Sequence, residues 1–384
     1  MRVCGVTFDH KVNYGSALQA YALQTAVEQT VIDGKPCEYA LVPLGTFPPY
    51  RPVPAVSKPA PRNVRRVLNR VKRSGRMLLG RYRRSRFVGF DETRLHFTAC
   101  AARDALPALN DRFDAFVCGS DVIWNFIYTK GDGSYFLDFA KKYKFSYAAS
   151  FGKAVLDYTE DGVQLAEPPE VIYRRGISGL DAVSVREPYG VTLASQFTDK
   201  PVQLVVDPTL LLSAEEWGKL AGPPVKKGKY IFAYCTSTRE NYVRFLAQLK
   251  KETGLPVINV AWLLNDALAQ HTLAFPTPEG WLSLLKNAAY VVTNSFHGTA
   301  FSVIFHKTFF TAVQDGREVR SNVRLYDFLD NMGLSDRLYA ACPDVIPKDA
   351  PDFTAADAKI ESLRASSLAY LRENLEAANA RKNQ

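Results

Sequence analysis

Residues 290–305 read Tyr-Val-Val-Thr-Asn-Ser-Phe-His-Gly-Thr-Ala-Phe-Ser-Val-Ile-Phe, and this stretch decides the fold class. The run Tyr290–Val292 is typical of a short buried strand, and Thr299–Phe305 follows it with a helical pattern. A strand that leads through a polar turn into a helix is the repeating unit of a parallel sheet. The stretch therefore predicts an α/β fold with His297 at the carboxyl end of a strand, where open α/β sheets bind ligands.

The same order of strand, turn and helix recurs in the first half of the chain. Each strand is a short apolar run that ends in a polar turn, which favours a parallel sheet. The expected strands are Val3–Phe8, Phe113–Val117, Ala182–Val185 and Val202–Val206. A helical pattern opens at Gly15, directly after the first strand and its polar loop.

A second series of strands and helices requires a second sheet. Its expected elements are the strands Tyr230–Tyr234, Pro256–Val260, Tyr290–Val292 and Thr308–Val313 and the helices Glu240–Lys251 and Glu279–Leu285. A chain of 384 residues also exceeds what one hydrophobic core usually supports. We expect an N-terminal α/β domain over residues 1–206, a second over 207–345, and a C-terminal helix within 346–384 that packs back on the body. Proline and glycine residues between 207 and 228 mark the crossing.

The composition indicates an ordinary globular protein, with 47% hydrophobic and 23% charged residues. The first residues lack the apolar segment of a secretory signal, and no apolar run reaches the length of a membrane span. The six cysteines are scattered, without the spacing of a metal site. We therefore expect a cytoplasmic protein with reduced cysteines.

The positive charge of the chain is concentrated between Lys58 and Arg94, where 13 lysine and arginine residues face only Asp91 and Glu92. Apolar residues recur there at helical spacing, so we expect an inserted basic helix or hairpin. Nucleic acid, an anionic membrane surface and an acidic acceptor all reward clustered positive charge, although most charge runs are solvated surface. We favour the inner face of a membrane as the candidate surface and predict no nucleic-acid partner.

The loop after Tyr290–Val292 carries residues suited to an anionic ligand. His297 can move a proton near neutral pH, and the backbone N–H groups around Gly298 can hold an anion at the helix start, with Asn294 and Ser295 beside them. The alternative is a capped helix whose histidine only satisfies a loop carbonyl.

Two further turns offer polar groups at strand ends. Gly15 follows Asn13 and Tyr14, and its missing side chain allows a substrate to approach the backbone. The other turn has Ser120, Asp121 and Asn125 to bond sugar hydroxyls and Trp124 to stack on a sugar ring. A helix N-cap and a core tryptophan are the alternative for this second turn. Neither a dinucleotide-binding nor a Walker fingerprint occurs in the chain.

Arginines follow two other expected strands. Arg186 comes directly after Ala182–Val185 and can hold a carboxylate or phosphate with two parallel hydrogen bonds. A local ion pair with Glu187 is the alternative. Arg320 and Arg324 lie in a polar segment after the strand Thr308–Val313, and we expect one or both to face the ligand.

Five motifs in register resemble the polysaccharide pyruvyl transferase family, from about the first strand to Asp327. They are Asn13-Tyr-Gly-Ser-Ala-Leu-Gln-Ala-Tyr-Ala-Leu-Gln, Gly119-Ser-Asp-Val-Ile-Trp-Asn, Ser184-Val-Arg-Glu, Asp207-Pro-Thr-Leu-Leu and Ser295-Phe-His-Gly. The resemblance implies two Rossmann-like domains facing a cleft, similar to the GT-B glycosyltransferase architecture. It also implies transfer of a pyruvyl group from phosphoenolpyruvate to a saccharide, free or lipid-linked, as a cyclic ketal in polysaccharide biosynthesis.

By the same resemblance, Arg186 matches the family arginine that grips phosphoenolpyruvate, and His297 matches the histidine implicated in binding and proton transfer. Ser295, Phe296 and Gly298 complete the matching loop. Protonation of the enol by His297 and stabilisation of the anions by arginines and helix-start N–H groups require no metal, so we expect no metal or cofactor. Two other readings stay open, namely a nucleotide-sugar glycosyltransferase of the same fold and a non-catalytic saccharide-binding assembly protein.

Overall fold

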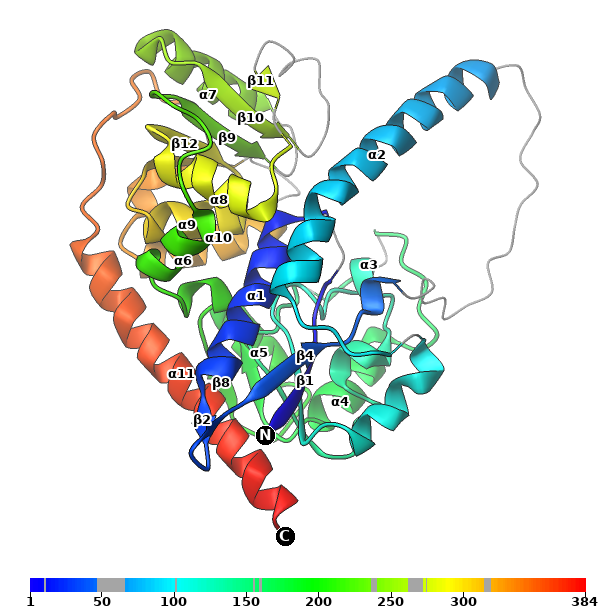
Figure 1. Cartoon of the computed structure of the whole chain (residues 1–384). Helices are drawn as coiled ribbons and strands as arrows, with labels where there is room; N and C mark the ends of the chain where they lie inside the picture. The colour runs from blue at the N-terminus through cyan, green and yellow to red at the C-terminus, as the bar shows by residue number, and fades with distance from the viewer. Residues whose placement is uncertain are drawn as a thin grey trace.

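Two parallel β-sheets, each flanked by helices, form two lobes in the computed structural model of the chain (Figure 1). The structure describes residues 1–9, 12–46, 66–100, 102–154, 156–158, 161–235, 240–261, 272–273, 275–313 and 319–384. Within these ranges the side chains of residues 66–79, 261, 272–273 and 319–321 lie outside the description. The α/β class predicted from the sequence is confirmed.

The first sheet has the strand order β4-β1-β5-β6, and all of its pairs are parallel. Its strands are β1 (Arg2–Val6), β4 (Glu38–Leu41), β5 (Ala115–Cys118) and β6 (Tyr143–Ser146). The parallel pair β7 (Val183–Val185) and β8 (Val202–Leu204) continues it through single bridges from Phe145 and Ala149. A small antiparallel hairpin, β2 (Val31–Ile32) and β3 (Lys35–Pro36), precedes β4.

The second sheet has the order β11-β10-β9-β12-β13-β14, again wholly parallel. Its strands are β9 (Ile231–Cys235), β10 (Val257–Ala261), β11 (Thr272–Leu273), β12 (Tyr290–Thr293), β13 (Thr308–Ala312) and β14 (Leu338–Tyr339). In chain order this is 3-2-1-4-5-6, the strand order of the Rossmann fold. Such a sheet binds ligands where the order reverses, here beside the carboxyl ends of β9 and β12.

Helices connect the parallel strands. They are α1 (Tyr14–Gln29), α2 (Arg66–Arg94), α3 (Phe126–Thr129), α4 (Pro169–Ser178), α5 (Pro188–Ala194), α6 (Ala214–Ala221), α7 (Glu240–Thr253), α8 (Pro278–Asn287), α9 (Phe296–Ile304), α10 (Val319–Asn331) and α11 (Thr354–Lys382). Short 3₁₀ turns occur between them, including Pro208–Leu210 after β8. Each strand predicted from the sequence is present within two residues of its expected ends.

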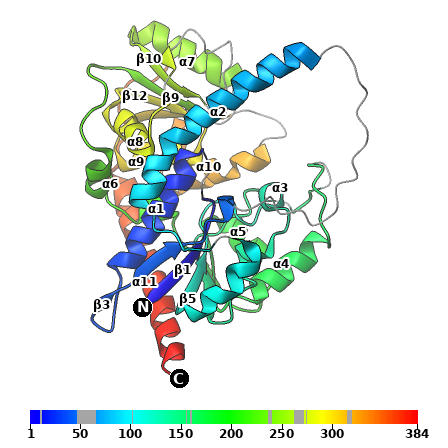
Figure 2. The same ribbon diagram turned by 45° about the vertical axis from the view of Figure 1, so that its right-hand side comes forward.

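Helix α1 joins the cores of the two lobes, and both views show it lying between them (Figures 1 and 2). Its apolar residues, such as Leu18 and Leu23, are fully buried. They belong to one hydrophobic cluster with Trp217 and Trp281, which come from α6 and α8. This shared core holds the carboxyl edges of the two sheets in a fixed relation.

Helix α11 returns from the second lobe to the first. Near its start Asp357 pairs with His306 at 2.8 Å. Further along, Tyr370 Oη donates a hydrogen bond to the carbonyl of Ser146 at the end of β6 (3.0 Å). The helix therefore packs back across the body, as Figure 1 shows by its course along one side of the molecule.

The basic stretch forms helix α2 from Arg66 onward, whereas residues 58–65 lie outside the described part. Its first half projects from the lobes in both views (Figures 1 and 2). Its last turns are anchored by Phe87, whose ring packs on Tyr14 of α1 at 4.9 Å. The surface that the projecting half would meet stays a prediction.

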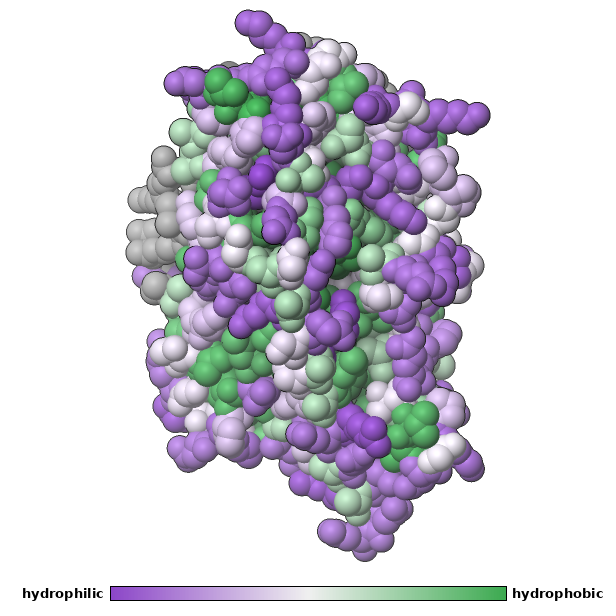
Figure 3. All heavy atoms as spheres, turned by 90° about the vertical axis from the view of Figure 1, so that its left-hand side faces the viewer, coloured by the Kyte–Doolittle hydropathy of each residue, from purple (hydrophilic) through white to green (hydrophobic). Residues whose placement is uncertain are grey.

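The face to the left in Figure 1 is mostly hydrophilic, with separate hydrophobic patches (Figure 3). Among the exposed apolar side chains are Val31 of β2 and Leu368 of α11, which line one shallow groove. No helix in the described ranges combines the length and the apolar character needed to cross a membrane.

We predict that α11 contributes strongly to stability through its buried face. Leu371 is fully buried, whereas Leu368 on the same helix is 37% exposed. Leu371→Ala is expected to lower the free energy of unfolding by about 2–5 kcal/mol, because it removes buried methyl groups and leaves a cavity. Leu368→Ala should cost less than about 1 kcal/mol. Urea titration measures both, and equal losses would show that α11 is not packed as described.

Candidate active site

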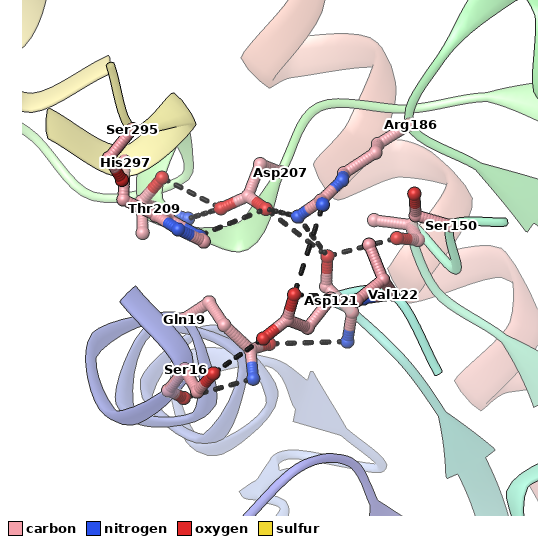
Figure 4. Close-up of polar contacts among 12 residues, drawn as sticks. Ser16, Gln19, Asp121, Val122, Ser150, Arg186, Asp207, Thr209, Ser295 and His297 are labelled. Atoms are coloured by element: carbon pink, nitrogen blue, oxygen red, sulfur yellow. Dashed lines mark hydrogen bonds and ion pairs between the residues drawn. The ribbon is translucent and has the colours of Figure 1, made fainter. Parts of the chain in front are cut away.

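Polar turns at the carboxyl ends of several strands meet between the two sheets (Figure 4). The first sheet contributes the turn after β5 with Ser120 and Asp121, and Arg186 after β7. Asp207 follows β8, and His297 comes from the first turn of α9, after β12 of the second sheet. Arg186 and His297 therefore converge on one place, as the sequence predicted.

Arg186 is the centre of this cluster, and its side chain is only 1% exposed. Its Nε donates to Glu187 Oε1 (2.9 Å), and its Nη1 donates to Asp207 Oδ2 (2.5 Å). Its Cζ lies 4.9 Å from the centre of the Phe296 ring, within reach of a cation–π interaction. Its Nη2 has no hydrogen-bond partner among the described residues, and Asp121 Oδ1 lies 3.9 Å from it.

Asp207 lies at the point where the cluster crosses from the first domain to the second. Its Oδ1 accepts hydrogen bonds from the backbone N–H (3.0 Å) and the hydroxyl (2.7 Å) of Thr209. These bonds orient the carboxylate so that Oδ2 faces Arg186, the hydroxyl of Ser120 (3.2 Å) and His297 Nε2 (3.6 Å). One carboxylate oxygen thus faces both residues to which the sequence assigned catalysis.

His297 packs directly against the start of α1. A side chain at Gly15 would place its Cβ 2.0 Å from His297 Nδ1, so only glycine leaves room for the imidazole. The sequence predicted that a substrate would approach Gly15, and the structure corrects this, because the group that approaches is His297. The other ring nitrogen, Nε2, is buried and has no hydrogen-bond partner in the described part of the chain.

Hydrogen bonds fix the remaining walls of the cluster. Ser16 of α1 donates from its hydroxyl to Asp121 Oδ2 (2.6 Å), and Gln19 accepts from the backbone N–H of Ser120 (3.2 Å). Ser150, which follows β6, donates to Glu187 Oε1 (2.8 Å). These contacts come from three separate elements and restrict the rotamers of the acidic residues.

The charges of the cluster are strongly coupled. Burial lowers the pKa of the Arg186 guanidinium, but the three surrounding carboxylates raise it above its ordinary value. Burial raises the pKa of Asp207, but the positive charges of His297 and Arg186 outweigh burial and hold this pKa well below its usual range. The pKa of Asp121 is lowered for the same reason. Titratable groups perturbed by specific partners in this way often mark functional sites.

A cavity of about 60 Å³ opens beside Arg186, between the domains. Arg186, Glu187 and Asp207 line it from one side, and Phe296 and Arg324 line it from the other. Arg324 Nε is buried and, within the described ranges, has no hydrogen-bond partner. Two guanidinium groups with an unused N–H donor therefore face the same small space.

Several residues predicted to bind substrate have structural partners instead. Trp124 is fully buried and stacks on Phe136 (5.6 Å between centroids), which corrects the expectation that it stacks on a sugar. Asn125 Oδ1 caps α3 by accepting from Ile127 N (3.0 Å). Here the N-cap and the core tryptophan were the correct alternative.

Helix starts account for other predicted residues. Asn13 caps α1 through Ser16 N (3.3 Å), and Tyr14 Oη donates to the carbonyl of Pro276 (3.0 Å) across the domains. Ser295 caps α9 by accepting from Gly298 N (3.5 Å).

Two predicted residues cannot be assigned contacts from the structure. Asn294 lies between β12 and α9. The side chain of Arg320, in the first turn of α10, is outside the described part.

Sequence reasoning missed Asp207 and Ser150, and it treated Glu187 only as a possible ion-pair partner. Asp207-Pro-Thr was interpreted as a domain boundary. A signal was nevertheless present, because Asp207 follows an expected strand just as Arg186 and Ser120 do. Nothing in the local sequence marks Ser150.

Solved structures of other proteins share this fold. UDP-N-acetylglucosamine 2-epimerase from Rickettsia bellii superposes with a TM-score of 0.52 at 11% identity, over 99% of this chain and 97% of that one. UDP-GlcNAc 2-epimerase from Neisseria meningitidis, bound to UDP-GlcNAc, gives 0.48 at 11% identity, over 99% and 94%. The chain is thus an α/β protein of two Rossmann-like domains with a GT-B-like architecture.

A sequence model of the polysaccharide pyruvyl transferase family matches residues 13–313. The chain belongs to the polysaccharide pyruvyl transferase family, as the five motifs indicated, and this is a family of transferases. No curated protein sequence matches the chain.

We predict that Gly15→Ala destabilises the protein by about 1–3 kcal/mol, because the added methyl group displaces the His297 ring in a packed site. Gly89 in α2 is the matched control, since a Cβ there meets nothing within 4 Å. Gly89→Ala should be neutral or stabilising by up to about 1 kcal/mol. Chemical denaturation compares the two, and a neutral Gly15→Ala would contradict the described contact.

We also predict a specific loss of stability in acid. The folded pKa of Asp207 lies below the unfolded value of about 3.9, so its contribution is complete above that pH and is lost as the pH falls. The free energy of unfolding should therefore decrease from about pH 4 downward. Asp207→Asn should be less stable than the unmodified protein at pH 7 and should show a shallower decrease. Parallel curves for the two proteins would contradict the lowered pKa.

Proposed function

We propose that the chain transfers the pyruvyl group of phosphoenolpyruvate to two hydroxyls of a saccharide, forming a cyclic ketal in the biosynthesis of a polysaccharide. The observation that carries this proposal is the meeting of Arg186 and His297 at one oxygen of Asp207. A fixed cation beside a histidine provides an anion-binding group and a proton donor in one place. Membership of the family supports the same reaction.

The donor carries a carboxylate and a phosphate, and both need positive partners. The free N–H donors are Arg186 Nη2 and Arg324 Nε, which line the cavity. A cavity of about 60 Å³ has room for roughly two water molecules, and hence for one anionic group rather than the whole donor. We therefore place one anionic group of phosphoenolpyruvate between Arg186 and Arg324, with the rest of the donor towards His297.

The chemistry needs one proton donor and requires no metal in principle. His297 Nε2 gives a proton to the methylene carbon, and the electrons of the C=C bond form the new C–H bond. The central carbon becomes electrophilic and forms two C–O bonds to acceptor oxygens, while its bond to the phosphate oxygen breaks. Of the two hydroxyl protons released, one restores His297 and the other leaves with phosphate. The products are the ketal and inorganic phosphate.

The proposal is tested by phosphate release from phosphoenolpyruvate with a panel of saccharide acceptors, free and lipid-linked. Acceptor-dependent release is expected, and His297→Ala should reduce it by about 10²–10⁴-fold, because the general acid is lost. His306→Ala is the control, since His306 is half exposed and pairs only with Asp357 on the surface of α11. Hydrolysis or transfer of a nucleotide sugar, without any effect of phosphoenolpyruvate, would overturn the proposal in favour of a glycosyltransferase.

Arg324 tests the position of the donor separately. Arg324→Ala should raise the KM for phosphoenolpyruvate by about 10–100-fold, as expected for one hydrogen bond to a charged group. Arg372 of α11, whose side chain is 65% exposed and pairs with Glu376, provides the control. A KM unchanged by Arg324→Ala would place the donor elsewhere. Arg186→Ala should also abolish turnover, but it leaves buried carboxylates unpaired, so its folding is checked by thermal denaturation.

A further inference from the structure

Asp207 holds a position that the reaction sequence described above does not explain. It is fully buried, and its two oxygens have different environments. Oδ1 is occupied by both donors of Thr209, which fix the plane of the carboxylate. Oδ2 is directed at Arg186 Nη1 and Ser120 Oγ and also faces His297 Nε2. The carboxylate is therefore held rigidly from three sides with one edge turned to the imidazole.

The distance between Asp207 Oδ2 and His297 Nε2 is 3.6 Å. This is within the range of an ion pair but too long for a hydrogen bond. In a buried site a carboxylate at this distance favours the protonated imidazole. Because it does not bond the Nε2 proton, it leaves that proton available for transfer to a substrate.

Arg186 decides which of the two groups carries the proton. Its Nη1 donates to the same oxygen that faces His297, and this contact stabilises the ionised carboxylate. Protonation of Asp207 would leave the buried guanidinium with a weaker acceptor, which is unfavourable. The pair therefore keeps its proton on the imidazole and its negative charge on the carboxylate.

Other charges also face the imidazole. Asp121, after β5, is close enough for the charge of His297 to lower its pKa, and it acts on the imidazole in the same direction as Asp207. Arg186 opposes both carboxylates, and Arg324 of α10 lines the neighbouring cavity. Asp207 differs from Asp121 in its direct approach to Nε2, and Asp121 has its oxygens bonded to Ser16 and to its own turn.

We propose that Asp207 is a positioning residue that keeps His297 protonated as the proton donor of the reaction. This proposal rests on the proposed function of the site. In the step concerned, the N–H bond at His297 Nε2 breaks, the proton goes to the methylene carbon of the enol, and the imidazole becomes neutral. Asp207 keeps its charge throughout and is neither a nucleophile nor a proton carrier.

The first test is the pH dependence of kcat/KM for phosphoenolpyruvate in Asp207→Asn. Loss of the carboxylate should move the alkaline limb of the profile to lower pH by about one to three units, as expected for loss of an opposite charge at this distance. Activity should recover as the pH is lowered. Asp207→Glu, which restores the charge, should move the limb back towards that of the unmodified enzyme. A uniform loss of activity at all pH values would reduce Asp207 to a structural role and overturn the proposal.

A matched control is available at the opposite edge of the same sheet. Asp114 precedes β5, is buried, accepts from the backbone N–H of Arg2 (2.8 Å) and pairs with Lys382 (3.3 Å). Asp114→Asn removes a buried paired carboxylate without changing the site. It should leave the pH profile in place, and a comparable shift in this variant would contradict a local effect of Asp207.

The second test does not depend on turnover. Nuclear magnetic resonance of histidine-labelled protein follows the ring of His297, assigned by comparison with His297→Gln. The titration midpoint of this ring should fall by a similar one to three units in Asp207→Asn. If the midpoint shifts but no acceptor supports phosphate release, the positioning role stands and the proposed function fails. If phosphate is released but the midpoint does not shift, the positioning role fails alone. Should the variants not fold, a neutral His297 ring in the unmodified protein at neutral pH would overturn the proposal.

Discussion

The site depends on one buried carboxylate oxygen, Oδ2 of Asp207, which faces Arg186 and His297 together. Burying a guanidinium and several carboxylates costs several kcal/mol per ion, and their mutual attraction only roughly offsets this cost. Such a network adds little net stability, yet removal of one member leaves a buried charge unpaired. The fold therefore holds these side chains in one arrangement, and a fixed arrangement of charges is what electrostatic catalysis requires.

The arrangement follows from the topology of the two sheets. All their strands are parallel, so every carboxyl end within a sheet lies on the same edge, and the turns after β5, β7 and β12 meet between the domains. Helix α1 completes the site, because Gly15 admits the imidazole and Ser16 bonds Asp121. The hydrophobic cluster that α1 shares with both domains keeps these edges in register. The fold thus brings together residues that are remote in the sequence.

The sequence predicted the strands that are apolar runs, such as β9 and β12, because burial on both faces leaves a continuous hydrophobic signal. It did not predict β4 and β6, which have four residues each and carry Glu38 and Lys144. His297 and Arg186 were found because each follows a recognisable strand. Asp207 was interpreted as a boundary, since Asp-Pro-Thr is also typical of a turn. Trp124 was misjudged because its burial against Phe136 depends on tertiary contacts.

The central claim is that the donor binds between Arg186, Arg324 and His297. A crystal structure of the protein soaked with phosphoenolpyruvate tests it most directly. The account predicts an anionic group of the donor within hydrogen-bond distance of Arg186 Nη2 and Arg324 Nε, with the methylene carbon facing His297 Nε2. Phosphoenolpyruvate bound away from this cavity, with His297 remote from its methylene carbon, would contradict it.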